Sequence, residues 1–102
     1  MIEKGNLLRK TGFYKTLSIL PSDGAIKLSE FYAKLTKISY YNLFLRVKSD
    51  LLQKRIIEID YKIVKIDHNQ KPVRHIGLTK NGVVLKHLLR ELIEQIDKGV
   101  DE

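Results

Sequence analysis

Residues 56–82, IIEIDYKIVKIDHNQKPVRHIGLTKNG, decide how this sequence folds. Apolar and polar residues alternate over 57–63, which is the two-residue period of a half-buried β-strand. Residues 68–72 are turn formers, and an extended, mostly apolar run follows over 73–78. Residues 79–82 then open a long helical pattern. The stretch therefore predicts a β-hairpin that leads directly into a helix.

Helical patterns also precede this hairpin. The first begins near Leu7 and stops at the turn formers Pro21–Gly24. Ala25–Lys27, which follows, is short enough to be a small strand or simply extended chain. Ser29 is a suitable N-cap for a second helix. Ser39 can cap a third helix that runs to Arg55, and the interval between these two helices is short. The predicted order is helix, turn, helix, turn, helix, hairpin, helix.

The Ser39–Arg55 segment has two distinct faces at 100° per residue. One face is apolar and is expected to meet the core; its residues are Tyr40, Leu43, Phe44, Val47 and Leu51. The opposite row is polar and has no carboxylate; its residues are Asn42, Arg46, Ser49 and Gln53. Leu45 and Leu52 lie beside this row, which is unusual for a face that meets only solvent.

The charge of the chain is positive and unevenly placed. Its 102 residues carry a formal net charge of +7. Up to Leu85 there are 16 Lys and Arg against 7 Asp and Glu, whereas from Lys86 onward there are 3 against 5. This asymmetry predicts an anionic partner for the body of the protein and a different role for the last helix.

Composition excludes several classes of protein. One domain of 102 residues can hold a single modest core, and 43% hydrophobic with 30% charged residues is ordinary for a globular chain. No apolar run approaches the roughly 20 residues that span a membrane. The N-terminus lacks the pattern of a signal peptide. The chain has no cysteine. We therefore expect a cytoplasmic protein without disulfides.

Catalytic and metal-binding patterns were sought and not found in the sequence. The three histidines, His68, His75 and His87, are widely spaced and form no metal-ligand motif. The six glycines are scattered singly, so there is no glycine-rich phosphate loop. We expect no enzyme activity, no cofactor and no metal. No polar cluster indicates a small-molecule effector.

At this point the sequence resembles the winged-helix DNA-binding proteins, in particular small microbial transcription regulators of the MarR, PadR and ArsR type. The resemblance is carried by four segments, which are SEFYAKL at 29–35, IS at 38–39, DLLQKRII at 50–57 and LTKNG at 78–82. It implies an α+β fold with a three-helix core, a hairpin wing and a long C-terminal helix. Residues of about 6–80 would form the core and about 81–98 the last helix, within a single domain over 1–102.

Two positions depart from the pattern of those regulators. Arg55 stands where many of them have glycine between the recognition helix and the wing, which predicts that the connection is not a left-handed glycine cap. Tyr40 and Tyr41 replace the small polar residues that are usual at the start of a recognition helix, and this leaves the register of base contacts open.

The predicted function is sequence-specific binding of double-stranded DNA by a homodimeric transcription regulator. An exposed helical row can read base edges in the major groove, while cations of a wing meet the phosphate backbone or the minor groove. The recognition-helix candidates are Ser39, Tyr41, Asn42, Arg46, Ser49 and Gln53. The wing and backbone candidates are Lys37, Lys65, His68, Asn69, Lys71 and Arg74.

The last helix has a wide apolar stripe, which can pack on the first helix or on a second copy of the chain. We expect the second copy, with the interface formed by Leu85, Leu88, Leu89, Leu92, Ile93 and Ile96.

Two other functions stay open for the protein. A winged helix can be a protein-interaction module that binds an acidic partner or RNA, and Leu45 and Leu52 favour it. A non-specific architectural DNA binder would need the charge but no base-reading row.

Overall fold

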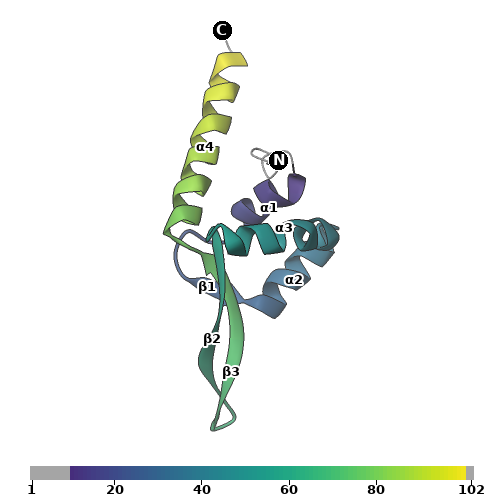
Figure 1. Ribbon diagram of the computed structural model, residues 1–102, viewed down its shortest axis with the longest axis vertical. Helices are drawn as coiled ribbons and strands as arrows, with labels where there is room; N and C mark the ends of the chain where they lie inside the picture. The colour runs from purple at the N-terminus through teal and green to yellow at the C-terminus, as the bar shows by residue number, and fades with distance from the viewer. Residues whose placement is uncertain (1–9, 101–102) are drawn as a thin grey trace.

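The computed structural model describes residues 10–100, which form four helices and a three-stranded sheet (Figure 1). The elements in chain order are α1 (Thr11–Ile19), β1 (Ala25–Lys27), α2 (Leu28–Lys37), α3 (Tyr41–Gln53), β2 (Ile57–Ile66), β3 (Asn69–Leu78) and α4 (Lys80–Val100). The molecule extends 59 × 36 × 27 Å, with the hairpin at one end and α4 at the other (Figure 1). The predicted element order and the α+β winged-helix class are confirmed. The predicted start of the first helix near Leu7 lies outside the described residues.

The sheet is antiparallel with the order β1-β3-β2, so the small strand pairs with the second strand of the wing. The hairpin is closed by a two-residue turn, Asp67-His68, in which φ is 48° and 68°. Positive φ at both central residues is the type I′ geometry that matches the twist of the flanking strands. The predicted turn at 68–72 was therefore wrong, because 69–72 belong to β3 and continue the ladder to Ile66, Lys65, Val64 and Ile63.

The helices α2 and α3 begin without side-chain caps. The N-cap of α2 is Lys27, not Ser29, and that of α3 is Tyr40, not Ser39. Ser39 instead has φ 63° and terminates α2. The amide of Ser39 donates to the Thr36 carbonyl, and the amide of Tyr40 donates to the Leu35 carbonyl. This is a Schellman motif, and it takes Ser39 out of the helix that it was predicted to cap.

The same motif ends α3, with Arg55 in the left-handed position that glycine usually takes. This residue has φ 55°, so it is left-handed despite its side chain. The Arg55 amide donates to the Leu52 carbonyl and the Ile56 amide donates to the Leu51 carbonyl at 2.9 Å. Ile56 and Leu51 are both buried, which supplies the apolar contact that usually accompanies this cap. That contact and two hydrogen bonds offset the cost of a left-handed arginine.

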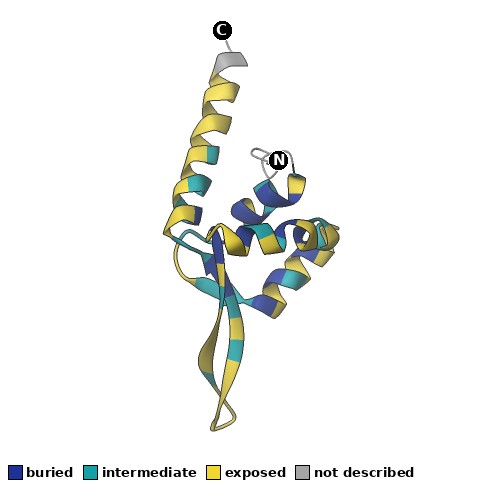
Figure 2. Ribbon diagram, viewed as in Figure 1, coloured by how far each residue is buried: buried dark blue, intermediate teal, exposed yellow. Residues whose placement is uncertain are grey.

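The core lies where the three short helices meet the base of the sheet (Figure 2). Its central side chains are almost completely buried, and they are Phe31, Phe44, Leu17, Leu20, Leu35, Leu51, Ile57, Ile76 and Val47. The predicted apolar face of α3 is confirmed at Phe44, Val47 and Leu51. The helices α1 and α3 cross closely, since a Cβ on Gly12 would lie 2.5 Å from the Leu43 carbonyl oxygen.

The start of α4 is hydrogen-bonded to the connection between α3 and β2. The Thr79 amide donates to the Ile56 carbonyl at 3.1 Å, and the Thr79 hydroxyl contacts the carbonyls of Arg55 and Ile56. The same hydroxyl accepts from the Gly82 amide at 3.1 Å, so Thr79 is the N-cap of α4. The helix begins at Lys80, one residue before the prediction, and continues to Val100. The end of α3, the start of the wing and the start of α4 thus meet at one junction.

The outer half of the hairpin differs from the prediction. The alternation over 57–63 predicted a half-buried strand, and Ile57 is indeed 2% exposed. Tyr61 and Ile63 continue the alternation, yet they are 67% and 66% exposed. The hairpin is longer than the core, so its outer residues extend past the helices into solvent (Figure 2).

None of the helices within residues 10–100 combines the length and apolarity that crossing a membrane requires.

Candidate nucleic-acid interface

The outward side of α3 carries the predicted polar row. Asn42, Arg46, Ser49 and Gln53 are all exposed. They lie on one side because α3 packs its opposite face, through Phe44, Val47 and Leu51, into the core. Within Tyr41–Gln53 the only carboxylate is Asp50, which is half-buried at the flank. The row therefore offers amide, guanidinium and hydroxyl groups without a nearby anion on its own face.

The residues at the start of α3 are arranged differently from the prediction. Tyr41 is half-buried, and its ring meets the Tyr32 ring edge-on at 5.2 Å between centroids. The Tyr32 hydroxyl accepts from Lys48 Nζ at 3.0 Å. Tyr41 is thus held in an aromatic contact between α2 and α3 and does not extend from the polar row. Ser39 and Lys37 are exposed at the end of α2, before the row begins.

The wing carries its predicted cations on both faces. Lys65, His68, Asn69, Lys71 and Arg74 are all exposed. Directly paired residues share a face of a hairpin. Lys65 pairs with Gln70 and Arg74 with Tyr61 on the face that leads to the core, whereas Lys71 and Asn69 lie on the opposite face. The wing candidates therefore surround the hairpin, and His68 lies in its turn.

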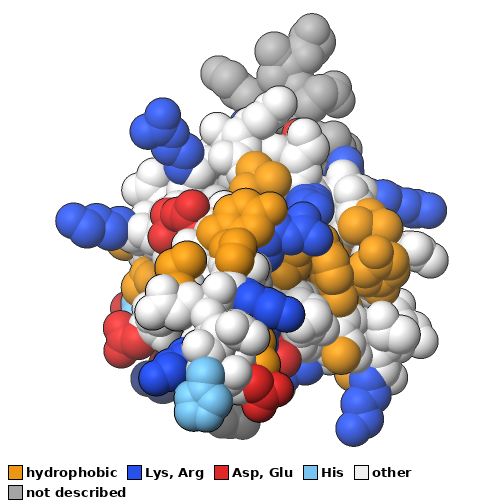
Figure 3. Space-filling model, turned by 90° about the horizontal axis from the view of Figure 1, so that it is seen from below, with side chains coloured by type: hydrophobic (Ala, Val, Ile, Leu, Met, Phe, Trp, Pro, Cys, Tyr) orange, Lys and Arg blue, Asp and Glu red, His pale blue; other side chains and the backbone are white. Residues whose placement is uncertain are grey.

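Exposed apolar residues accompany both elements. On α3, Leu45 and Leu52 are exposed beside the polar row, as the helical angles predicted. On the wing, Tyr61, Ile63 and Ile66 are exposed and were not predicted as site residues. The sequence signal was present, because a strand that alternates over more residues than a small core can cover must expose its far end. Seen from the wing's end, hydrophobic and cationic side chains are intermixed (Figure 3).

The apolar stripe of α4 is divided between the core and solvent. Leu85 and Leu89 are half-buried and pack against the core, so only part of each side chain is accessible. Leu88, Leu92, Ile93 and Ile96 are at least half exposed, and so is Val84, which was not predicted. A cavity of about 260 Å³ between α1 and α4 is lined by Phe13, Tyr14, Leu17, Leu85, Leu88, Leu89 and Leu92. This groove continues into the exposed stripe.

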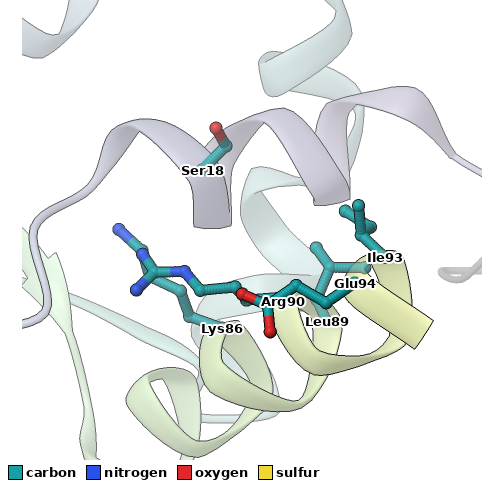
Figure 4. Close-up of a pocket in the computed structure, with 6 residues that line it drawn as sticks. All are labelled: Ser18, Lys86, Leu89, Arg90, Ile93 and Glu94. Carbon is teal, nitrogen blue, oxygen red and sulfur yellow. The ribbon is translucent and has the colours of Figure 1, made fainter. Parts of the chain in front are cut away.

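A second cavity between α1 and α4, of about 190 Å³, has a structural explanation (Figure 4). Its lining includes Ser18 of α1 and Lys86, Arg90 and Glu94 of α4. Lys86 Nζ donates to the carbonyl of Leu20 at the end of α1. Burial lowers the pKa of the Lys86 ammonium, and the neighbouring Arg90 guanidinium lowers it further. Lys86 thus links α4 to the end of α1 through a hydrogen bond within this cavity.

Over residues 10–100, no group of three or more His, Asp or Glu could hold a metal.

No protein-family model matches the sequence, and no curated protein matches it significantly. A solved structure, that of a PadR-like transcription factor from Bacteroides fragilis, is similar in fold. The two chains share 19% sequence identity with a TM-score of 0.56, and the alignment covers 96% of this chain and 95% of that one. The likeness spans the wing and α4 as well as the helical core. The resemblance inferred from the sequence is therefore confirmed as a likeness of fold: the chain is a winged-helix protein with the architecture of a PadR-like regulator.

Proposed function

We propose that this protein binds double-stranded DNA in a sequence-specific manner as a homodimeric transcription regulator inside the cell. The observation that carries the proposal is the exposed row of α3, which has donors and acceptors but no carboxylate on its face. A helix of this kind fits the major groove of B-DNA. The basic body and the structural likeness to a PadR-like transcription factor support the same function.

Two side chains of α3 are proposed to read bases. An asparagine can pair with adenine through two hydrogen bonds, and an arginine can pair with guanine in the same way. Asn42 and Arg46 are exposed, and one helical turn separates them. Ser49 and Gln53 extend the row toward the end of α3, where they can meet bases or phosphates. Specificity is therefore assigned first to Asn42 and Arg46.

The wing is proposed to bind the backbone. Lys71 and Arg74 lie on opposite faces of β3, so a hairpin placed at a groove can present one cation to each flanking strand. Lys65 and His68 add donors near the tip, and Lys37 lies at the other end of the surface, after α2. These contacts would position the protein and carry no sequence information.

Two single substitutions distinguish recognition of bases from binding of the phosphate backbone. Arg46→Ala is expected to reduce the preference for the selected site by about 1–3 kcal/mol, because it removes a bidentate base contact. Lys71→Ala is expected to weaken every duplex alike and to flatten the log–log salt dependence by about 0.9, because one phosphate contact is lost. Fluorescence anisotropy measures both effects on the best duplex selected from a random pool and on a scrambled duplex.

The controls also test the alternative functions. If wild type binds no duplex at low salt, the DNA function is wrong, and a protein-interaction module that uses Leu45 and Leu52 becomes the better explanation. If Arg46→Ala and Lys71→Ala weaken selected and scrambled duplexes equally, the protein is a non-specific architectural binder. The selection step gives the same distinction, since an architectural binder enriches no sequence.

A second copy of the chain is the proposed partner of α4. Val84, Leu88, Leu92, Ile93 and Ile96 are between 50% and 58% exposed. A helix this long with so many exposed apolar residues is costly in water, and burial against a symmetric copy removes that cost. The apolar groove beside α1 widens the surface that a second α4 could cover. A dimer would also place two copies of α3 at a fixed spacing, as an inverted repeat requires.

The dimer is tested by charge placement on α4. The double variant Leu92→Asp/Ile96→Asp is expected to be a folded monomer, because both side chains are exposed in the single chain and only the interface would bury them. His87→Asp is the matched control on another side of the same helix and should stay dimeric. Light scattering after size exclusion gives the mass, for comparison with 11.9 kDa per chain. A monomeric wild type at micromolar concentration contradicts the proposal.

A further inference from the structure

The outer wing exposes three apolar side chains, Tyr61, Ile63 and Pro72, which the core does not cover and which have no part in the proposed phosphate contacts. Through the strand register, Ile63 lies opposite Pro72 and Tyr61 lies opposite Arg74. These four side chains share one face of the hairpin, and it is the face that buries Ile57 and Ile76 nearer the core. Beyond Ile59 the side chains on this face are exposed, and Arg74 lines a cavity with Leu28, Ser29 and Tyr32 at the start of α2.

The hairpin is thin where this face is exposed. The small strand β1 pairs only with residues 75–77 of β3, so the outer part of the wing consists of two strands. In this outer part residues 61–66 of β2 pair with residues 69–74 of β3, and six residues of β-strand extend about 20 Å. A two-stranded ribbon of that length can lie along a groove of DNA, and several DNA-bending proteins place apolar side chains of such elements against base steps.

The charges around the apolar face point to a polyanion as its occupant. On the face of Tyr61 and Ile63, the charged side chains of the outer wing are Lys65 and Arg74. Residues 61–74 as a whole carry two further cations, Lys62 and Lys71 on the opposite face, and one acidic residue, Asp67. An apolar surface bordered by cations is complementary to the minor groove, whose floor is apolar in part and whose walls are phosphates. The wing therefore combines exposed apolar side chains, which can enter a groove, with cations that can bind phosphates.

We propose that Tyr61 and Ile63 enter the DNA minor groove as an apolar wedge, partly unstack a base step and bend the duplex. This inference rests on the proposed DNA binding and adds a second mode of recognition to it. A pyrimidine–purine step unstacks more easily than a stiff A-tract. The protein would thus favour sites with a flexible step under the wing, at base pairs that α3 does not touch.

The test measures bending separately from binding. A duplex of about 30 base pairs that carries the selected site, with a donor and an acceptor dye at its two ends, reports its bend by energy transfer. Wild type is expected to raise the transfer efficiency. The double variant Tyr61→Ser/Ile63→Ser should bind with little or no rise. Ile66→Ser, at an exposed isoleucine on the opposite face of the wing, is the matched control and should bend the DNA as wild type does. Because Tyr61 and Ile63 are about two-thirds exposed, the double variant should keep its melting temperature.

A second measurement addresses the step itself. Replacing a pyrimidine–purine step under the wing by an A-tract should lower wild-type affinity by roughly tenfold. The same replacement should leave the affinity of the double variant nearly unchanged. A loss of equal size in both proteins means that the step is read by another part of the protein and overturns the wedge.

The remaining outcomes separate this inference from the proposed function. Tight binding of a straight duplex by wild type overturns the wedge and leaves DNA recognition by α3 intact. Failure to bind any duplex overturns both. Vesicles of phosphatidylserine and phosphatidylcholine test the other polyanionic surface. If the double substitution abolishes vesicle co-sedimentation and wild type does not bend DNA, the apolar face of the wing belongs to a membrane surface and the DNA wedge is wrong.

Discussion

Replacing Phe44 by alanine is expected to destabilise the protein by about 3–5 kcal/mol, the range measured for loss of a large aromatic side chain from a core. The Phe44 ring is completely buried and meets the Phe31 ring edge-on at 4.9 Å between centroids. It also lies 6.1 Å from the Tyr32 ring, so it links α3 to α2. Single domains have about 5–15 kcal/mol of stability in total. The variant is therefore expected to lose about a fifth or more of it.

Urea unfolding followed by circular dichroism checks this expectation. The midpoint should fall while the slope stays the same, since the surface exposed on unfolding hardly changes. Leu45→Ala is the matched control, because Leu45 is the next residue on the same helix and is exposed. It should change stability by no more than about 0.5 kcal/mol. Similar losses in the two variants would contradict the orientation of α3, and with it the outward row.

Much of the fold could be predicted because its signals are local or periodic. The stripe of Phe44, Val47 and Leu51 identifies the buried face of α3 at once, and the opposite row follows from the same angles. The alternation over 57–63 predicts β2, and the turn formers at 21–24 predict the end of α1. The exposed positions of Asn42 and Arg46 follow from the period of a helix and needed no tertiary information.

The errors arose where tertiary contacts override local preference. Ser39 and Arg55 are left-handed although neither is glycine, because each helix ends in a Schellman motif whose following residue, Tyr40 or Ile56, packs on the apolar interior. Serine was expected to cap the next helix for the usual reason, and that reason is local. Where such a helix ends depends on whether the residue after the left-handed position can be buried in the core. A pattern in a single sequence does not show this.

The wing shows a second kind of error. Alternation reveals that a strand has one apolar side, but it does not reveal where the core ends. Ile57 is buried and Ile63 is exposed, although both obey the same two-residue period. The polar run after Asp67 was also interpreted as a loop, whereas a turn of two residues returns it to the ladder. Both errors concealed the same feature, a long exposed ribbon with an apolar face.

Replacing Gly82 by alanine is expected to destabilise the protein by about 1–3 kcal/mol, the usual cost of forcing an added methyl group into a packed site. The direction is opposite to the common effect, since alanine in place of a helical glycine normally stabilises by about 0.5–1 kcal/mol. At this position a Cβ would lie 2.1 Å from the Ile56 carbonyl oxygen and 3.1 Å from the Leu78 side chain. The methyl group therefore forces α4 away from the α3–β2 connection.

Asn81→Ala is the matched control for this prediction, because Asn81 is exposed in the same first turn of α4. It should change the thermal midpoint little or raise it slightly, since alanine is the better helix former. Displacement of α4 in Gly82→Ala would also disturb the hydrogen bond from the Gly82 amide to Thr79, which fixes the direction of the helix. A folded Gly82→Ala protein should then bind an inverted repeat more weakly than wild type while still binding a single half-site. Unchanged stability would mean that α4 does not lie against Ile56, and the proposed spacing of the two recognition helices would lose its structural basis.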